Sequence, residues 1–420
     1  MTKYESAGYR RYVLIILTLV YAVNFIDRQL LTILQESIKV ELDLSDLQLG
    51  LLTGLAFAIF YVLAGIPIAR LAERSSRRNI IAASIGIWSL MTALSGFVAN
   101  YAQLVLARIG VGIGEAGCSP PAHSMISDMY PPEQRASALS FYSTGINIGI
   151  MFGILFGGII NEYFGWRTAF LVVGLPGLVV AVIVWITVQE PIRGWSEKST
   201  VEQEPASFMR VLNFILARGY LVHVSIAAGL SGFVGYSLTS WTPPFFIRSF
   251  SMGTAELAWW LAASVGFLGA LGTFGWGYLC DRYGQKDKRW YLWLPGLAIL
   301  LAIIPVCIVF TATDKMTALI ANMFMAFFMT GYLGATLAVL HGTVEPRMRA
   351  TASALYFLVL NIIGLGCGPT FVGWISDLLR PEFGDESLRY AVLYVIPIVC
   401  VWSFVHFILA ARGMLKANES

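Results

Sequence analysis

The sequence predicts an all-α membrane protein in which twelve transmembrane helices form two pseudo-symmetric six-helix bundles. Of its 420 residues, 57% are hydrophobic and only 13% are charged, whereas soluble domains carry about a quarter charged residues. Apolar runs of about 20 residues, the length that a helix needs to cross the hydrocarbon core of a bilayer, recur along the whole chain. Short polar stretches separate these runs, so we expect the chain to cross the membrane many times.

The apolar runs and their polar breaks define the expected spans in order. The first six cover roughly residues 12–34, 50–71, 79–99, 103–127, 137–160 and 168–189, and the second six roughly 220–246, 257–280, 290–311, 317–342, 351–375 and 390–411. We therefore divide the chain into an N-terminal bundle (1–189), a cytoplasmic linker with an expected interfacial helix (190–219) and a C-terminal bundle (220–420).

The distribution of basic residues predicts the orientation of the chain. Of the 28 Lys and Arg residues, 20 fall in loops or tails on the side of the N-terminus, 6 fall on the opposite side and 2 lie within spans. Because cytoplasmic loops carry an excess of Lys and Arg, both termini are expected in the cytoplasm. We therefore expect a multi-pass protein located in the cell inner membrane.

Cysteine usage and short motifs exclude several other classes of protein. The five cysteines lie in or beside apolar segments and form no Cys-x-x-Cys pair, so neither a disulfide framework nor a metal site is expected. The first apolar run is longer than a signal-peptide core and is not followed by a small-residue cleavage site, so we expect it to remain as a span. No P-loop lysine motif is present, which argues against ATP-driven transport, and no cofactor is expected.

Two pairs of similar segments indicate an internal repeat. After the second span stands "ARLAERSSRR" (69–78), and after the eighth stands "GYLCDRYGQK" (277–286). After the fourth span stands "RASALSFYSTGINIG" (135–149), and after the tenth stands "RATASALYFLVLNIIG" (349–364). Two six-helix halves of like design place a substrate site at their interface and favour alternating access by rocking of the halves.

The same segments carry a family resemblance. "GYLCDRYGQK" resembles the loop 2–3 signature of the major facilitator superfamily, and the first copy departs from it at Ala69, Glu73 and Ser76. Within that superfamily, "NFIDRQLLTIL", "GLLTGLAFAIFYVLAGIPIARLAERSSRRNII" and "RIGVGIGEAGCSPPAHSMISDMYPPEQRA" resemble the spinster-like branch. The resemblance implies lipid transport, and it implies that helices 1 and 4 line a central cavity.

Four ionisable residues lie within apolar runs: Asp27 and Arg28 in the first, and Arg108 and Glu115 in the fourth. Such residues cost about 2.5–3.5 kcal/mol on insertion scales and indicate function. Arg108 and Glu115 are two helical turns apart and share a face, while Asn24, Asp27 and Arg28 form a stripe on the first helix.

We expect these residues to couple transport to protons. An acid whose arginine partner moves can change its protonation state, so Asp27 is the expected switch, Arg108 its mobile partner, and Glu115 a second site for a proton or substrate. Arg28 is expected to bind an anionic headgroup through charge-assisted hydrogen bonds, with Asn24 beside it. The alternative is a buried ion pair between Asp27 and Arg108 that only locks the first helix to the fourth.

The second half offers aromatic rather than charged side chains. Its six spans contain no Asp, Glu, Lys or Arg, and we expect Tyr236 and Tyr332 to contact substrate. A cavity that is charged on one wall and apolar on the other suits an amphipathic molecule better than a sugar.

The cytoplasmic loops suggest a gate made of ion pairs. Glu73, Arg74 and Arg77 are expected near Asp128 at the end of the fourth span. In the second half, Asp281 and Arg282 are expected to play the equivalent part. The alternative is that these arginines serve only to set the orientation of the chain.

One motif suggests an enzyme but is poorly arranged for catalysis. "HSMISD" (123–128) matches the His-x4-Asp pattern of glycerolipid acyltransferases. Five residues on a continuous helix place the two side chains about 140° apart, so one active site is not expected.

The sequence therefore predicts a proton-coupled secondary transporter for an amphipathic lipid such as a lysophospholipid or a sphingolipid phosphate, not an enzyme. A proton-coupled carrier for organic anions or drugs is the first alternative, and a transport-inactive receptor or scaffold is the second. The expected partners are the cargo, protons and the bilayer, without nucleic acid, and a monomer suffices because one chain supplies a whole cavity.

Overall fold

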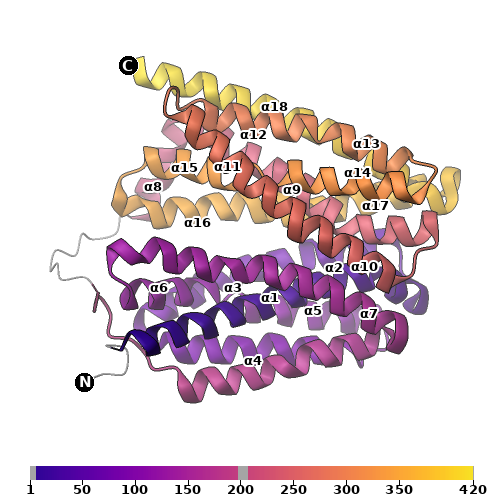
Figure 1. Cartoon of the computed structure of the whole chain (residues 1–420), viewed down its shortest axis with the longest axis horizontal. Helices are drawn as coiled ribbons and strands as arrows, with labels where there is room; N and C mark the ends of the chain where they lie inside the picture. The colour runs from indigo at the N-terminus through magenta and orange to yellow at the C-terminus, as the bar shows by residue number, and fades with distance from the viewer. Residues whose placement is uncertain (1–5, 197–206, 420) are drawn as a thin grey trace. The chain divides into compact units, whose positions relative to one another are not determined.

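The structure, a computed structural model, describes residues 6–196 and 207–419, and every regular element in these ranges is a helix (Figure 1). The predicted all-α class is confirmed. The chain forms two compact units: unit 1 contains 1–44, 56–202 and 253–262, and unit 2 contains 45–55, 203–252 and 263–420.

Unit 1 is built mainly from the first half of the chain. Its helices are α1 (Ala7–Leu42), α3 (Leu55–Arg74), α4 (Arg77–Ser95), α5 (Tyr101–Glu115), α6 (Ser119–Met129), α7 (Pro132–Thr187) and α10 (Thr254–Ala263). Although α7 is continuous in hydrogen bonding, Gly165 has φ +79° and ψ 161°, which splits it into two helices. Glycine is required there because a side chain disfavours positive φ.

Unit 2 is built mainly from the second half. Its α-helices are α2 (Asp46–Thr53), α8 (Phe208–Ala217), α9 (Gly219–Phe250), α11 (Ala270–Gly284), α12 (Trp290–Leu301), α13 (Ile303–Thr311), α14 (Lys315–Met329), α15 (Leu333–Thr343), α16 (Arg349–Val359), α17 (Gly368–Phe383) and α18 (Ser387–Glu419). Two π-helical stretches, η2 (Ser264–Gly269) and η4 (Leu360–Cys367), lie within its long helical runs. The helix predicted in the linker is present as α8; residues 197–206 of that linker lie outside the described residues.

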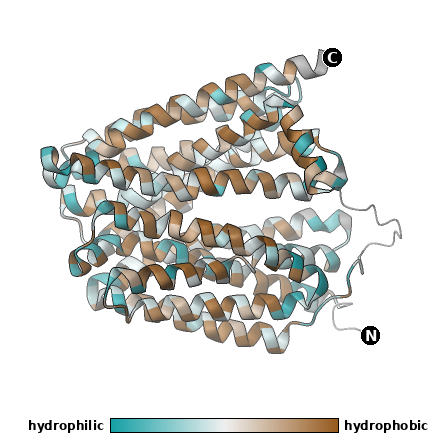
Figure 2. Ribbon diagram, turned by 180° about the vertical axis from the view of Figure 1, so that it is seen from behind, coloured by the Kyte–Doolittle hydropathy of each residue, from teal (hydrophilic) through white to brown (hydrophobic). Residues whose placement is uncertain are grey.

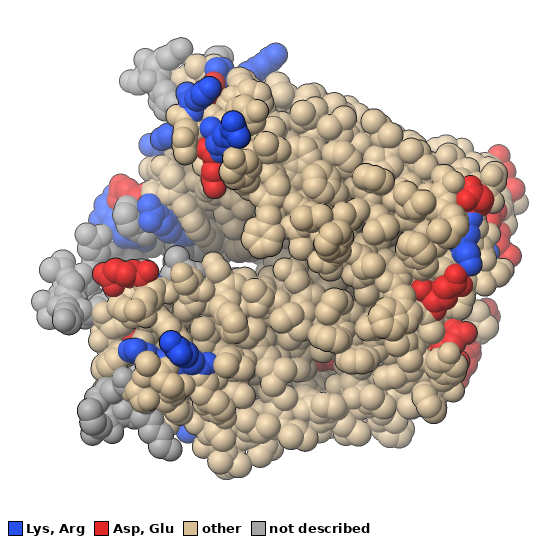
Figure 3. Space-filling model, in the orientation of Figure 1, with Lys and Arg blue, Asp and Glu red and all other residues tan. Residues whose placement is uncertain are grey.

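The helices account for twelve spans within the described ranges. Eight segments are long and apolar enough to cross a membrane, and two of these, with 55 and 65 residues, hold two spans each. The remaining two spans are α4 and the pair α5 and α6, which a short turn separates. In both units the helices are apolar along most of their length (Figure 2), and the charged side chains in view gather near helix ends (Figure 3).

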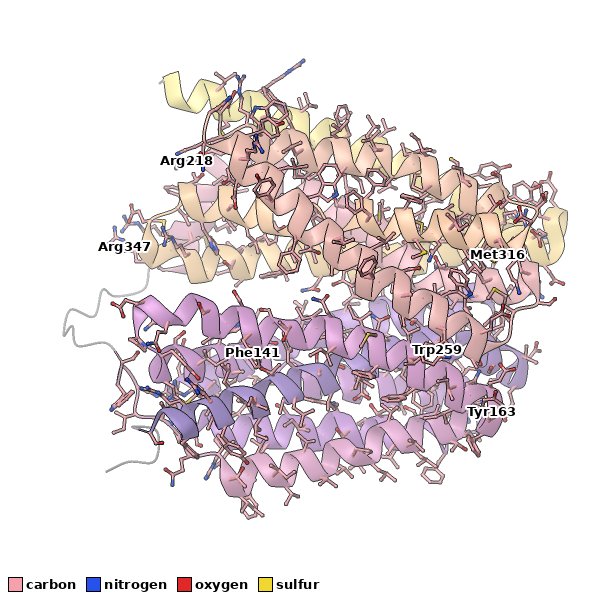
Figure 4. The ribbon with its side chains drawn as sticks, in the orientation of Figure 1. Phe141, Tyr163, Arg218, Trp259, Met316 and Arg347 are labelled. Carbon is pink, nitrogen blue, oxygen red and sulfur yellow. The ribbon has the colours of Figure 1, made fainter. Side chains whose placement is uncertain are left out.

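Two of the predicted spans change unit partway along. The second span consists of α2 in unit 2 and α3 in unit 1, and the chain passes from one unit to the other between Leu55 and Ala56. The eighth span begins as α10 in unit 1 and continues through η2 into α11 in unit 2. In Figure 4, Trp259 of α10 and Tyr163 of α7 lie at the same end of unit 1.

The start of α2 is fixed within unit 2 by polar contacts. Arg248 donates from both terminal nitrogens to the Asp46 carboxylate, at 2.9 and 2.8 Å, and Ser376 donates to it at 2.6 Å. The Asp377 carboxylate accepts the backbone N–H groups of Asp46 and Leu47, which are otherwise unpaired at a helix start. Asp46 is only 2% exposed, so this is a buried pair.

The first part of α7 packs closely on α1 through a stripe of glycines. A Cβ at Gly145 would lie 2.7 Å from the backbone oxygen of Thr18, and one at Gly153 would lie 2.8 Å from that of Ile26. Small residues at four-residue spacing permit this approach. The contact places the polar face of α1 in a fixed position inside unit 1.

Candidate functional site

The centre of unit 1 holds an ion pair between α1 and α5. Arg28 Nε donates to Glu115 Oε2 at 2.6 Å. Glu115, the last residue of α5, is 1% exposed, and the side chain of Arg28 is 16% exposed. Asn24, which lies one turn before Arg28 on α1 and is 2% exposed, faces Glu115. The structure therefore brings together three of the predicted site residues.

Aromatic rings surround the guanidinium group of Arg28. Its central carbon lies 5.1 Å from the ring centre of Phe25 and 5.0 Å from those of Phe57 and Tyr61. The guanidinium carbon of Arg108 lies 5.3 Å from the same Phe57 ring. Aromatic faces attract cations at this range, most strongly away from water. The rings therefore replace part of the hydration that Arg28 and Arg108 lose.

Asp27 and Arg108 are buried, at 1% and 3% exposure, but the locking ion pair between them, which was the alternative interpretation, is not formed within the described residues. Both oxygens of Asp27 lack a hydrogen-bond partner in the described part of the chain. The groups that interact electrostatically with Asp27 belong to Glu115, Thr92 and Arg108. The acid of α5, Glu115, is instead paired with Arg28, the next residue after Asp27 on α1.

The predicted substrate tyrosines lie together in unit 2. Tyr236 of α9 and Tyr332, at the start of α15, pack against one buried cluster that contains Tyr356 and Leu360. The Tyr356 hydroxyl is hydrogen bonded to Thr336 at 2.6 Å. These contacts give the cluster a polar edge within an otherwise apolar surrounding.

Of the ion-pair cluster predicted near Asp128, the structure shows the part around one arginine, Arg77. Arg77 is 1% exposed, donates to Asp128 and Glu190, the latter at 2.7 Å, and also reaches the Ser124 hydroxyl at 2.7 Å. The sequence did not indicate Glu190. Glu190 also accepts the backbone N–H of Arg78 at 2.9 Å, at the beginning of α4.

Glu73 and Arg74, predicted in the same cluster, are exposed at the end of α3 and make no ion pair among the described residues. Arg77, the first residue of α4, is the buried member of the three. For Glu73 and Arg74 the predicted contact with Asp128 is therefore wrong.

The second-half loop has a different arrangement. Asp281 accepts from the Tyr291 hydroxyl at 2.7 Å, and Arg282 donates to the Tyr278 hydroxyl at 3.2 Å, so neither repeats the contacts of Arg77. In the loop that follows α11, the side chain of Arg289 donates to Asp287 at 2.8 Å. This hydrogen bond holds the pKa of the Asp287 carboxyl below its usual value.

Several contact residues carry no distinctive sequence signal. Phe57, Tyr61 and Thr92 stand in apolar runs where such residues are common, and only the spacing of Phe57 and Tyr61, one helical turn apart, places them on one face. Tertiary contacts alone show that they meet the charged residues.

Comparison with known proteins identifies the family. The Major Facilitator Superfamily profile matches residues 17–293 and 248–418. The chain is 32% identical over 394 residues to an MFS-type efflux pump of Mycolicibacterium smegmatis, with 92% of this chain and 90% of that protein covered.

Two further relatives belong to the spinster group. A solved bacterial homologue of the human lysosomal transporter Spinster, inward-facing and unoccupied, matches with a TM-score of 0.90, 34% identity and 98% of both chains covered. The sphingosine-1-phosphate transporter SPNS2 of Xenopus tropicalis is 26% identical over 431 residues, covering 96% of this chain and 82% of that protein. These likenesses confirm the predicted fold and the resemblance to spinster proteins.

Proposed function

Because this chain belongs to the Major Facilitator Superfamily, whose relatives here are transporters and not enzymes, we propose that it moves an amphipathic, anionic, lipid-like molecule across a membrane by proton-coupled alternating access. The observation that carries the proposal is the ion pair of Arg28 with Glu115 at 2.6 Å, held in the interior of unit 1. It joins one group that can take up a proton to one that can bind an anion.

The pair supports a direct competition between proton and cargo. While Glu115 is ionised it occupies the Nε donor of Arg28. A proton on Glu115 removes its negative charge, and the guanidinium group can then donate to a phosphate or carboxylate of the cargo. Arginine suits this task because its planar donors match both groups bidentately and keep their charge. Proton and anionic cargo then bind together and move in the same direction.

Asp27 and Arg108 supply a second place for a proton. An ionised carboxylate that is buried without hydrogen bonds is costly, and neither oxygen of Asp27 has a partner among the described residues. Thr92 and Arg108 face it, so a small movement of α4 or α5 changes its surroundings. We assign Asp27 to the same protonation cycle as Glu115.

The apolar part of the cargo requires a different surface. Tyr236 and Tyr332 combine hydroxyl groups with ring faces in one cluster of unit 2, and we assign them to cargo binding. The relatives support a lipid-like cargo, since SPNS2 of Xenopus tropicalis is named a sphingosine-1-phosphate transporter.

A second candidate is a proton-coupled carrier for organic anions or drugs. It is supported by the 32% identity to the efflux pump of Mycolicibacterium smegmatis, which is similar to the 34% identity to the bacterial Spinster homologue. The same Arg28 site would serve an organic carboxylate as readily as a lipid phosphate.

The arrangement of charged groups supports a membrane orientation and a gate. We assign both termini to the cytoplasm of a cell with the protein in its inner membrane, because Lys and Arg concentrate on that side of the predicted spans. Arg77, Asp128 and Glu190 then lie on the cytoplasmic side. We assign them to the cytoplasmic gate, which closes when these pairs form.

Uptake into proteoliposomes tests the proposal. Purified protein is reconstituted, and entry of a fluorescent lysophosphatidic acid is followed with the outside acidic relative to the lumen, with acid on both sides, and without protein. We expect the gradient to drive accumulation in wild type and not in Glu115→Gln or Asp27→Asn. Gradient-independent uptake in all three proteins contradicts proton coupling, and uptake of organic anions alone favours the second candidate.

A further inference from the structure

Among the described residues, Phe57 is the one ring that lies close to the guanidinium groups of both Arg28 and Arg108. The guanidinium carbons of Arg28 and Arg108 lie 5.0 and 5.3 Å from its ring centre. Two cations at such close quarters repel each other, and an aromatic face attracts each of them. The ring therefore contacts both guanidinium groups of the charged site.

The position of Phe57 is itself closely determined within unit 1. The residue is 1% exposed and its ring stacks on Tyr61 at 5.6 Å with an angle of 18° between the planes. On the side of α5, a Cβ at Gly112 would lie 3.0 Å from the Phe57 backbone oxygen, so the two helices touch there. A displacement of this part of α3 must carry the ring with it.

The backbone just before Phe57 contains both a helix break and the boundary between the two units. The chain passes from unit 2 to unit 1 between Leu55 and Ala56, two residues before the ring. Gly54, with φ −109° and ψ −102°, interrupts the helix between α2 and α3. On the unit 2 side, the Thr370 hydroxyl lies 3.0 Å from the Gly50 carbonyl oxygen, to which it donates, and 3.4 Å from the Leu55 nitrogen. The last residues before the boundary are thus tied to unit 2.

We propose that Phe57 is a positioning residue that links the backbone junction at Gly54 to the charged site. A change of backbone angle at Gly54 moves the ring, and the ring moves the guanidinium groups of Arg28 and Arg108 relative to Glu115. Phe57 touches neither proton nor cargo, and its effect on both passes through the arginines. The inference rests on the proposed function, because it assigns a consequence to the Arg28–Glu115 pair.

The test separates ring electronics from ring size. Phe57 is replaced by tyrosine, which keeps the aromatic face, by leucine, which removes it, and by trifluorophenylalanine, which withdraws electron density from the face at nearly constant volume. The same three changes at Phe60 are the matched control, because Phe60 lies on the same helix and has no cation over its ring among the described residues. The melting temperature Tm of each purified protein is measured against pH in detergent, without cargo.

We expect the midpoint of the Tm profile to move to higher pH by about half to one unit in Phe57→Leu, the size that loss of an ordinary cation–π contact predicts. Without the ring, the arginines hold the carboxylates less effectively in their charged form. The trifluorinated protein should shift in the same direction, Phe57→Tyr should stay within about 0.2 unit of wild type, and the Phe60 variants should not shift.

Any of three results overturns the positioning role. The first is the same midpoint for wild type and Phe57→Leu, and the second is the same shift for the Phe57 and Phe60 variants. The third is a wild-type profile that has no midpoint between about pH 4 and pH 9. The assay contains no cargo, so its outcome is independent of lipid uptake. If wild type takes up the lipid in response to the pH gradient and Phe57→Leu has the same Tm profile as wild type, the role of Phe57 is contradicted and the proposed function still stands.

Discussion

Arg28 and Glu115, 87 residues apart in the sequence, form an ion pair of 2.6 Å in the interior of unit 1. Asp27, the neighbour of Arg28 on α1, has no such partner among the described residues. The two acids of the site therefore differ in their surroundings. Glu115 is in direct contact with a cation, whereas Asp27 interacts only with more distant charges. This asymmetry permits two protons to be taken up in separate steps.

The energetic weight of the pair can be measured by a double-mutant cycle. Glu115→Gln leaves the Arg28 cation buried without its partner, so we expect it to lose roughly 3–5 kcal/mol of stability. Arg28→Gln together with Glu115→Gln should recover part of this loss, with a coupling of about 1–3 kcal/mol. Thermal unfolding in detergent gives the values, and additive effects of the two substitutions contradict the pair.

The pair that holds α2 gives a second prediction. Arg248→Gln removes the cation that balances Asp46, which is 2% exposed, and the buried acid without this cation should cost about 3–5 kcal/mol. The control is Arg347→Gln, whose pair with Glu345 is exposed and should contribute about 0–1 kcal/mol. Tm measurements at the same pH check both, and equal losses would show that the buried pair does not stabilise α2.

The cluster around Arg77 predicts unequal effects for three neighbouring residues. Arg77→Met leaves Asp128 and Glu190 without their shared cation and should lower stability by about 2–4 kcal/mol. Glu73→Ala and Arg74→Ala change exposed side chains and should stay within about 0.5 kcal/mol of wild type. Tm again reports the difference. A loss in Glu73→Ala as large as that in Arg77→Met would restore the original assignment.

The close packing of α7 on α1 predicts that two glycines respond oppositely to alanine. A Cβ at Gly153 meets the backbone oxygen of Ile26 at 2.8 Å, whereas one at Gly86 meets nothing within 4 Å. Gly153→Ala should therefore destabilise the protein, by about 1–3 kcal/mol as for other overpacked sites. Gly86→Ala should be neutral or stabilise by up to about 1 kcal/mol. The yield of folded protein and its Tm in detergent measure both effects. A Gly86→Ala variant less stable than Gly153→Ala would contradict the close packing of α7 on α1.

The fold was largely predictable because the bilayer imposes a strong rule on sequence. A span needs about 20 apolar residues, so twelve spans can be counted without tertiary information. The break at Gly54 and the transfer of α2 to unit 2 were not predictable, because contacts across 315 residues to Thr370 and 202 residues to Arg248 hold α2 there.

The site was predictable in its members but not in its pairing. Charges inside apolar runs are rare enough to identify Asp27, Arg28, Arg108 and Glu115 without a structure. Which arginine meets which acid depends on the rotation of each helix about its axis, and adjacent positions differ by about 100°. Phe57 gave no signal, because an aromatic residue in a span is expected for packing alone.

The measurement that tests the central claim most directly is binding of a short-chain lysophosphatidic acid to purified protein across pH, for wild type, Glu115→Gln and Arg28→Gln. If a proton on Glu115 frees Arg28 for the cargo, wild type binds more tightly as pH falls. Glu115→Gln then binds tightly at every pH, and Arg28→Gln binds weakly at every pH. Wild-type affinity that does not change with pH, or equal affinity in Arg28→Gln and wild type, contradicts the claim.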